Sequence, residues 1–433
     1  MLNYFFSFLD FFLSFWWLIT PFLLTYLFIE KYYSNNLKTF IKTKVNYKFF
    51  EIIFPSSTLK KIQLMDNVFT SLHSTAESFS PAKQFFSGYF PLAYIFIIAF
   101  HDKNLKFFVG VDEKKEKVLK TSFYSQYPEI QFIETVNPLS KFKFNLPHPL
   151  YNGLFFNINI SGPYNAILLK THKDIESLPE EERVDPASVF WEIKENISNK
   201  EWLFFIIYAL PILSNDLILG KNWINSYKAI IDSLIGKPSP PPPLPFSYYL
   251  HEFFRNLLTG LFKDITWTPF SSPPPPPFEF NIGKIPPENK EIIDKILHKV
   301  EKPGFLVDFK AFYLAKSDIF EKTSSYIPNL ILSAFKNFSL EKINVFSLKP
   351  FFSLKKGERF YNLKNFILNL SSFNSLKKHS AIFIKVLGIL KNEASTELKY
   401  ILNSEELSLI FHHPFKPQRF GFEKAEPPQA PLS

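Results

Sequence analysis

The first thirty residues constrain this chain most, because they are almost wholly apolar. Residues 5–29 read FFSFLDFFLSFWWLITPFLLTYLFI, and Asp10 is the single charged residue among them. As a helix this stretch would be about 37 Å long, enough to cross a hydrocarbon core of about 30 Å. A buried core helix would show a polar stripe, and a signal peptide would show a basic start and a cleavage site. We therefore expect a transmembrane helix at residues 1–30.

The segment that follows, residues 31–48, is basic and predicts the orientation of this helix. Positive charge on one flank indicates the cytoplasmic side of a span. We therefore expect a single-pass protein of the cell membrane, in contact with the lipid bilayer, with its N-terminus outside and residues 31–433 in the cytoplasm. The basic residues of this flank are Lys31, Lys38, Lys42, Lys44 and Lys48.

Composition excludes several kinds of chemistry. Cysteine is absent from the 433 residues, which rules out disulfide bonds, thiol catalysis, iron–sulfur clusters and thiolate zinc sites. Hydrophobic residues make up 46% of the chain, enough to bury a core, so wholesale disorder is excluded. Lys and Arg total 49 against 40 Asp and Glu, a formal net charge of +9. This excess permits an anionic partner, but it is also common on a solvated surface.

The pattern of apolar runs predicts a ferredoxin-like domain over residues 49–150. The expected order is β-α-β-β-α-β, an antiparallel sheet with both helices on one face. A polar four-residue turn, residues 101–104, joins the second and third strands. The expected elements are strands at 49–54, 92–100, 105–111 and 129–136, and helices at 59–74 and 114–126.

The same order recurs over residues 151–350, where a Pro-rich helical insertion at 211–286 interrupts it. The chain is thus expected to be an α+β protein with two ferredoxin-like domains, each a four-stranded antiparallel sheet backed by two helices. Residues 351–413 would form an α/β extension, and residues 414–433 a Pro-rich tail. The expected elements of the second domain are strands at 166–171, 202–210, 304–315 and 343–348, and helices at 185–197 and 326–338.

The insertion contains a helix, Tyr248–Ile265, between proline runs at 238–245 and 273–277. Such runs favour extended polyproline II spacers, so the helix is expected to stand away from its domain and dock on a partner. Folding back onto its own sheet and lying on a membrane surface are the alternatives. The residues of its apolar face are Leu250, Phe253, Phe254, Leu257, Leu258, Leu261 and Phe262.

No catalytic, metal-binding or cofactor-binding residues are predicted, so we expect a protein that is not an enzyme. The Gly-Lys pairs at 220, 236 and 283 lack the flanking residues of a phosphate-binding loop. His412-His413 is typical of a loop or a helix end. Glu181-Glu182 and Glu405-Glu406 are typical of solvated acids in a first helical turn.

Lysines interleaved with Phe in the last third of the chain leave a nucleic-acid interface open as an alternative. A phosphate-tracking surface with stacking aromatic rings has this composition, and so does an ordinary α+β domain from an AT-rich genome. The lysines concerned are Lys310, Lys316, Lys336, Lys342, Lys349, Lys355, Lys356, Lys377 and Lys378.

Several segments, taken in order, resemble a known protein family. They include MDNVFTSLHS (65–74), VLKTSFYSQYPEIQFIE (118–134), DPASVFWEIKEN (185–196), VEKPGFLVDFKAFYLA (300–315) and ILNSEELSLIFHHP (401–414). They are similar to the uncharacterised, non-ATPase region that precedes the motor in membrane-anchored bacterial proteins resembling type IV secretion and conjugation ATPases. In the long members a RecA-like ATPase follows, whereas this sequence stops at Ser433. No catalytic residue therefore carries over.

The resemblance implies a membrane-anchored scaffold or adaptor subunit of a type IV secretion- or conjugation-like system. It would position or regulate a separately encoded ATPase motor. The alternative is a membrane-attached module that binds nucleic acid during DNA transfer or uptake.

Overall fold

The structure is a computed structural model of the whole chain. It describes residues 46–54, 62–78, 91–141, 150–162, 167–179, 182–218, 221–237, 286–340, 343–354 and 400–414, together with residues 21, 24, 25, 28 and 32.

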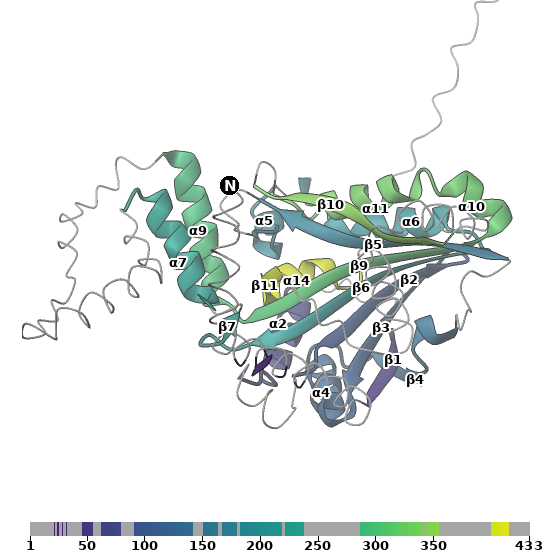
Figure 1. The fold of residues 1–433 in the computed structure, drawn as a ribbon, viewed down its shortest axis with the longest axis horizontal. Helices are drawn as coiled ribbons and strands as arrows, with labels where there is room; N and C mark the ends of the chain where they lie inside the picture. Colours follow the sequence, from purple (N-terminus) through teal and green to yellow (C-terminus); the bar gives the residue numbers. More distant parts are fainter. Residues whose placement is uncertain are drawn as a thin grey trace, which may run out of the picture.

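One antiparallel sheet of nine strands forms the centre of the described structure (Figure 1). Eight strands follow the order β10-β5-β9-β6-β2-β3-β1-β4, and β11 pairs with one end of β9. The strands are β1 (Tyr47–Ile53), β2 (Tyr94–His101), β3 (Asn104–Asp112), β4 (Gln131–Thr135), β5 (Tyr151–Ser161), β6 (Glu201–Ile212), β9 (Gly304–Lys316), β10 (Val345–Leu354) and β11 (Tyr400–Asn403). A separate small hairpin consists of β7 (Leu217–Ile218) and β8 (Lys221–Asn222).

The prediction of two separate four-stranded sheets is wrong, because β2 and β6 pair along their whole shared length. Their register runs from Tyr94 opposite Ala209 to His101 opposite Trp202. As edge strands, these two apolar segments would each expose a row of unpaired backbone N–H and C=O groups. Pairing them satisfies both rows and makes one continuous sheet.

Within this sheet the strand order of the first half, β4-β1-β3-β2, recurs in the second half as β10-β5-β9-β6. The second half begins with β5, not with the strand expected at residues 166–171. In that region Leu169 makes only an isolated bridge to Ser339. The sequence of β5, YNGLFFNINIS, mixes Gly and Asn with its apolar residues, and so its strand signal is weak.

Helices cover the two faces of the sheet unequally. The larger buried cluster contains residues from α2, α4, α6, α10, α11 and α14, and the smaller one contains residues from α7 and α9. Strand residues alternate between the clusters, as Phe96 and Ile97 do. The helices are α2 (Gln63–His73), α4 (Glu116–Gln126), α5 (His172–Glu176), α6 (Val189–Asn196), α7 (Trp223–Leu234), α9 (Pro287–Glu301), α10 (Ser317–Thr323), α11 (Ile327–Lys336) and α14 (Ser404–Ile410).

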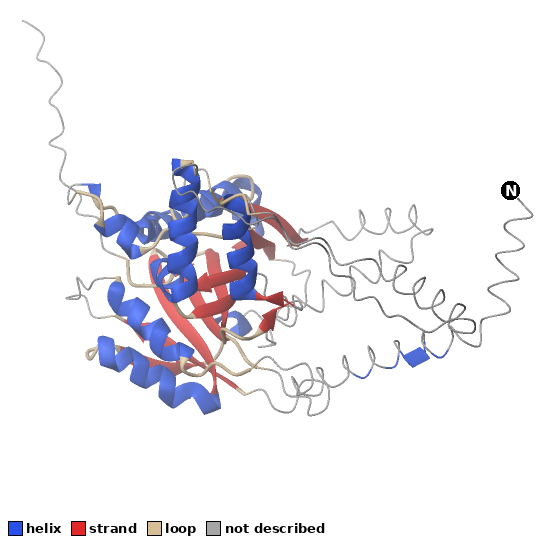
Figure 2. Ribbon diagram, turned by 90° about the vertical axis from the view of Figure 1, so that its left-hand side faces the viewer, coloured by secondary structure: helices blue, strands red, loops and turns tan. Residues whose placement is uncertain are grey.

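Helices α7 and α9 stand beside each other at one end of the sheet (Figures 1 and 2). The side chain of Asn289, near the start of α9, donates a hydrogen bond to the Leu234 carbonyl at the end of α7, at 3.4 Å. The two helices therefore run in opposite directions. The expected insertion helix at 248–265 falls between them, outside the described residues.

The expected membrane span is not upheld. Among the described residues no helix is both long enough and apolar enough to cross a bilayer. The expected single-pass location, the outward N-terminus and the contact with lipid are corrected with it. An apolar sequence is necessary for a membrane span but not sufficient, because a span also needs about 20 consecutive residues in one helix. Most of residues 1–45 lie outside the described part; two described side chains there, Leu24 and Phe28, are 64% and 68% exposed.

The turn between β2 and β3 yields a stability prediction. Asp102 and Lys103 have positive φ angles of 49° and 55°, as a two-residue type I′ turn requires. A side chain with a Cβ is strained in this conformation. We expect Lys103→Gly to raise the free energy of unfolding by about 0.5–1 kcal/mol, measured by urea denaturation. Lys103→Ala, which removes the same charge but keeps the Cβ, is the control and should bring no gain.

Candidate functional site around the C-terminal helix

The short helix α14 lies inside the core, although it follows in the chain long after the main strands. All seven of its residues are buried, including Ser404, Glu405 and Glu406. Charged side chains are almost never fully buried unless they are paired. The expectation that Glu405-Glu406 is a solvated acidic pair is therefore wrong, and the partners of these carboxylates mark the site.

A capping box fixes the start of α14. The side chain of Asn403 accepts a hydrogen bond from the Glu406 backbone N–H at 2.8 Å. In return the Glu406 carboxylate accepts one from the Asn403 backbone N–H at 2.9 Å. This arrangement satisfies two backbone donors that would otherwise be unpaired at the helix start.

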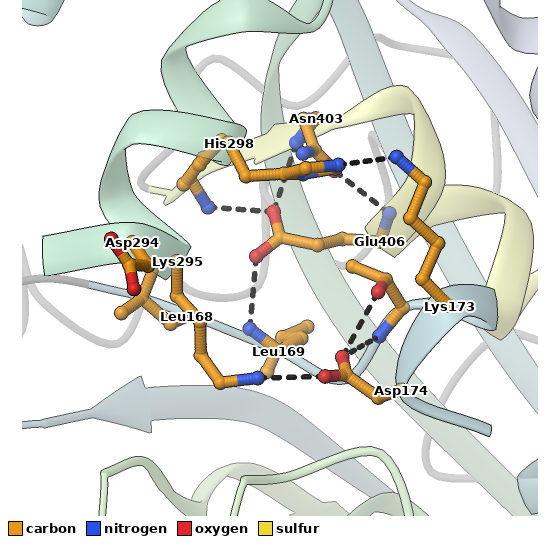
Figure 3. A pocket seen from close by; sticks show the side chains of 11 residues that line it. Leu168, Leu169, Lys173, Asp174, Asp294, Lys295, His298, Asn403 and Glu406 are labelled. Atoms are coloured by element: carbon orange, nitrogen blue, oxygen red, sulfur yellow. Dashed lines mark hydrogen bonds and ion pairs between the residues drawn. The ribbon is translucent and has the colours of Figure 1, made fainter. Parts of the chain in front are cut away.

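Glu406 makes a buried ion pair with Lys299 of α9. The Lys299 Nζ donates to Glu406 Oε2 at 2.6 Å and to the Ile167 carbonyl at 2.6 Å. The second carboxylate oxygen accepts from the Leu169 backbone N–H at 2.9 Å. Figure 3 shows Glu406 between Leu169 and Asn403. Burial lowers the pKa of Lys299, and the neighbouring Glu406 opposes this shift.

A pocket of about 210 Å³ opens beside this pair (Figure 3). Polar side chains line it, and they pair with one another. Lys295 lies 2.7 Å from the Asp174 carboxylate, and Lys173 Nζ lies 2.6 Å from His298 Nε2. Burial alone would raise the pKa of Asp174, but Lys295 and the Thr171 backbone N–H hold it below its ordinary value. The cations of this pocket are therefore already matched with local acceptors.

Glu405, the residue before Glu406 in α14, is surrounded by basic groups. Lys302 Nζ lies 2.9 Å from Oε1, Lys173 Nζ lies 3.3 Å from the same oxygen, and His298 Nδ1 lies 3.4 Å from Oε2. Burial would raise the pKa of Glu405, but these neighbours, Lys302 first, lower it below its ordinary value. Glu405 is thus a charged carboxylate inside the fold.

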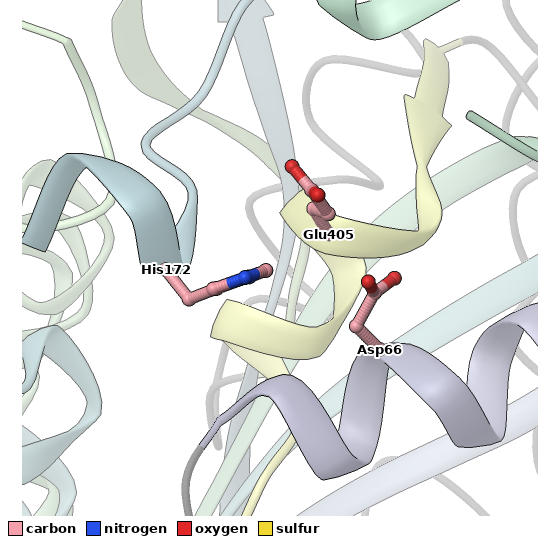
Figure 4. A group of neighbouring side chains, drawn as sticks. All are labelled: Asp66, His172 and Glu405. Carbon is pink, nitrogen blue, oxygen red and sulfur yellow. The ribbon is translucent and has the colours of Figure 1, made fainter. Parts of the chain in front are cut away.

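Two further buried polar side chains face Glu405. They are Asp66 from α2 and His172 from α5, and one potential ligand atom of each of the three residues lies within 4.8 Å of the others. Figure 4 shows the His172 ring pointing toward the space between the two carboxylates. A second capping box, in which the Asp174 carboxylate accepts from the Thr171 backbone N–H at 2.8 Å, positions His172 at the start of α5. The sequence pattern did not indicate this group, because its members are far apart in sequence; the expectation of no metal-ligating residues stays a prediction.

The residues that follow α14 also make buried hydrogen bonds. The His412 ring lies between two partners: its Nδ1 is 3.0 Å from the Ser408 carbonyl, and its Nε2 is 3.0 Å from the Asp185 carboxylate. The indole N–H of Trp191 donates to the Pro414 carbonyl at 3.1 Å. His412-His413 does follow the helix end, but His412 is buried and bonded, which its place in the sequence did not indicate.

The other expected site residues are not brought together here. The docking residues Leu250, Phe253, Phe254, Leu257, Leu258, Leu261 and Phe262 lie outside the described residues, and their role stays a prediction. Of the basic residues, Lys310 pairs with Asp308 at 3.4 Å and lies over the Tyr208 ring, so its charge is turned inward. Lys316 ends β9 and Lys336 ends α11, on different elements.

Comparison with known proteins finds no matching family model, no matching curated protein and no matching solved structure.

The buried ion pair yields a second stability prediction. Lys299→Met leaves the Glu406 carboxylate in the core without its cation, and we expect the free energy of unfolding to fall by about 3–5 kcal/mol. Lys295→Met, which breaks the more exposed pair with Asp174, should cost about 1 kcal/mol or less. Urea denaturation measures both. Equal losses in the two variants would show that Lys299 contributes nothing beyond a surface ion pair.

Proposed function

We propose that the chain is a scaffold or adaptor subunit of a type IV secretion- or conjugation-like system, which positions or regulates a separate ATPase motor. The observation that carries the proposal is the burial of α14 in the core. The residues that follow α14 are held on the same face of the sheet, where the Trp191 indole binds the Pro414 carbonyl.

The segments that resemble the secretion and conjugation family meet around α14, which supports the proposal. Lys302, in the segment 300–315, bridges Asp66 in the segment 65–74 and Glu405 in the segment 401–414. The segment 185–196 supplies two further contacts to the segment 401–414. Motifs that are weak one by one thus belong to one packed unit in space.

The contacts of Pro414 determine how rigid this attachment point is. The Trp191 indole donates to its carbonyl, and the ring of the preceding His413 packs against Trp191, Phe54 and Phe107 at centroid distances of 5.9, 5.3 and 6.2 Å. These contacts fix, relative to the sheet, the point at which the chain continues beyond Pro414. This is the property that a positioning subunit needs.

The helix pair α7–α9 offers a second point of attachment. The insertion leaves from the end of α7 and returns at the start of α9, where the hydrogen bond between Asn289 and Leu234 joins the two ends. The predicted docking helix at residues 248–265 therefore belongs to an insertion whose two ends both adjoin the α7–α9 helix pair. We propose that its apolar face contacts the same motor.

Co-purification with a motor tests this function. We expect the full chain to release no phosphate from ATP by itself, and to retain a separately encoded, hexamer-forming ATPase when both are produced in one cell. Trp191→Phe removes the hydrogen bond to Pro414 but keeps a ring, and it should reduce the amount of ATPase retained severalfold. Mass spectrometry and phosphate release identify and quantify the retained protein.

Trp202→Phe is the matched control, because Trp202 stacks on His101 at the opposite end of β2 from α14 and lies in a different pocket. Retention should be unchanged in this variant. ATP hydrolysis by the purified chain, or equal retention by the Trp191→Phe variant and the wild type, would contradict the proposal.

A further inference from the structure

We propose that Asp66, His172 and Glu405 form a binding site for a divalent transition metal of the Zn²⁺ class, which links three segments of the chain. The three residues come from α2, α5 and α14, so the site would join the first half of the sheet, the connection after β5 and the C-terminal helix. The inference goes beyond the scaffold function and does not depend on it.

Buried polar atoms without a hydrogen bond mark this position as a candidate site for a cation. Asp66 Oδ1 and His172 Nδ1 are buried and make no hydrogen bond within the described part of the chain. The Glu405 carboxylate beside them is held by ion pairs with Lys302, Lys173 and His298. The three residues are 4%, 3% and 0% exposed. Buried side-chain polar atoms without a hydrogen bond are rare in folded proteins, and each costs free energy. A single cation between the three would satisfy one atom of each.

The types of ligand favour a transition metal over magnesium or calcium. Mg²⁺ and Ca²⁺ prefer sites built from oxygen alone, whereas Zn²⁺ accepts imidazole nitrogen together with carboxylate oxygen. Tetrahedral bonds of about 2.0–2.1 Å place ligand atoms about 3.4 Å apart. The ligand atoms here lie within 4.8 Å of one another, so small rotations of the side chains bring them to that spacing.

Two lysines contact the carboxylates of this site in the structure. Lys302 Nζ lies 3.4 Å from Asp66 Oδ2 and 2.9 Å from Glu405, and Lys173 also faces Glu405. Their side chains are 31% and 54% exposed, so their ammonium groups reach solvent by rotation. Metal binding would replace the ion pairs of these two lysines with direct coordination of the carboxylates. Lysine and metal would therefore compete for the same carboxylates.

Zinc binding by the full chain tests the site. After removal of metal with EDTA, we expect titration calorimetry to show one equivalent of Zn²⁺ bound. The midpoint of thermal unfolding should rise by about 5 °C at a large excess of free Zn²⁺ over the dissociation constant. Mg²⁺ at the same concentration should leave the midpoint unchanged. Co²⁺ should give the visible absorption of a four-coordinate centre.

Variants separate this site from adventitious binding by other histidines. Asp66→Asn keeps the shape of the side chain and His172→Gln keeps a polar side chain of similar length; each should weaken Zn²⁺ binding at least tenfold. His101→Gln is the control and should bind like the wild type, because His101 lies in another pocket. Lys302→Met removes the competing ammonium group and should tighten binding severalfold.

The same experiment can overturn the proposal. If the wild type binds no stoichiometric Zn²⁺, or if His172→Gln and Asp66→Asn bind as tightly as the wild type, the three residues are not metal ligands. They would then form an ion-pair cluster that Lys302 and Lys173 neutralise. Should one of these two variants fail to fold, the other and the Lys302→Met variant still decide the question.

Discussion

The Glu406 carboxylate accepts hydrogen bonds from Lys299 Nζ, the Leu169 backbone N–H and the Asn403 backbone N–H. These three donors lie far from one another in the sequence. Lys299 belongs to α9 on one side of the sheet, and Leu169 lies in the connection before α5. A charge buried at this point is stable only while all three donors stay in place, because each lost bond leaves an ionised group in a medium of low polarity. The position of α14, and hence of Glu405 and Pro414, follows from this one group.

The continuous sheet gives this arrangement its rigidity. Pairing of β2 with β6 leaves β4 and β10 as the outermost strands of the eight-strand path, and it places β6 and β2 in its middle. Helix α14 lies against this central region, where Phe411 contacts Phe96 of β2 at 4.8 Å between ring centroids. Residues 404–414 are thus held by both halves of the fold, and a rotation of one half against the other would break these contacts.

Local sequence determined part of this fold and left the rest open. The strands β2 and β3 and their turn could be predicted, because their apolar runs flank a polar tetrapeptide. The junction of β2 with β6 could not, since a continuous apolar run indicates burial on both faces but does not identify the neighbouring strand. The acids of α14 were misjudged for a similar reason: a first-turn acidic pair has the same local pattern in solvent and in the core. Its deciding partner, Lys299, lies 107 residues earlier in the sequence.

The late position of α14 in the chain also has a consequence for synthesis. The strands from β1 to β10 leave the ribosome before residues 400–414, and until then the apolar side chains that α14 covers, Phe96 and Phe107 among them, lack their final neighbour. Domains emerge from the ribosome N-terminal part first, at about 5–20 residues per second, and incomplete cores expose apolar surface. The interval between β10 and β11 therefore amounts to several seconds in which these apolar side chains lack the residues that cover them in the folded protein. An order of synthesis of this kind leaves apolar surface uncovered for longer than in a chain whose last element lies at the edge of the fold.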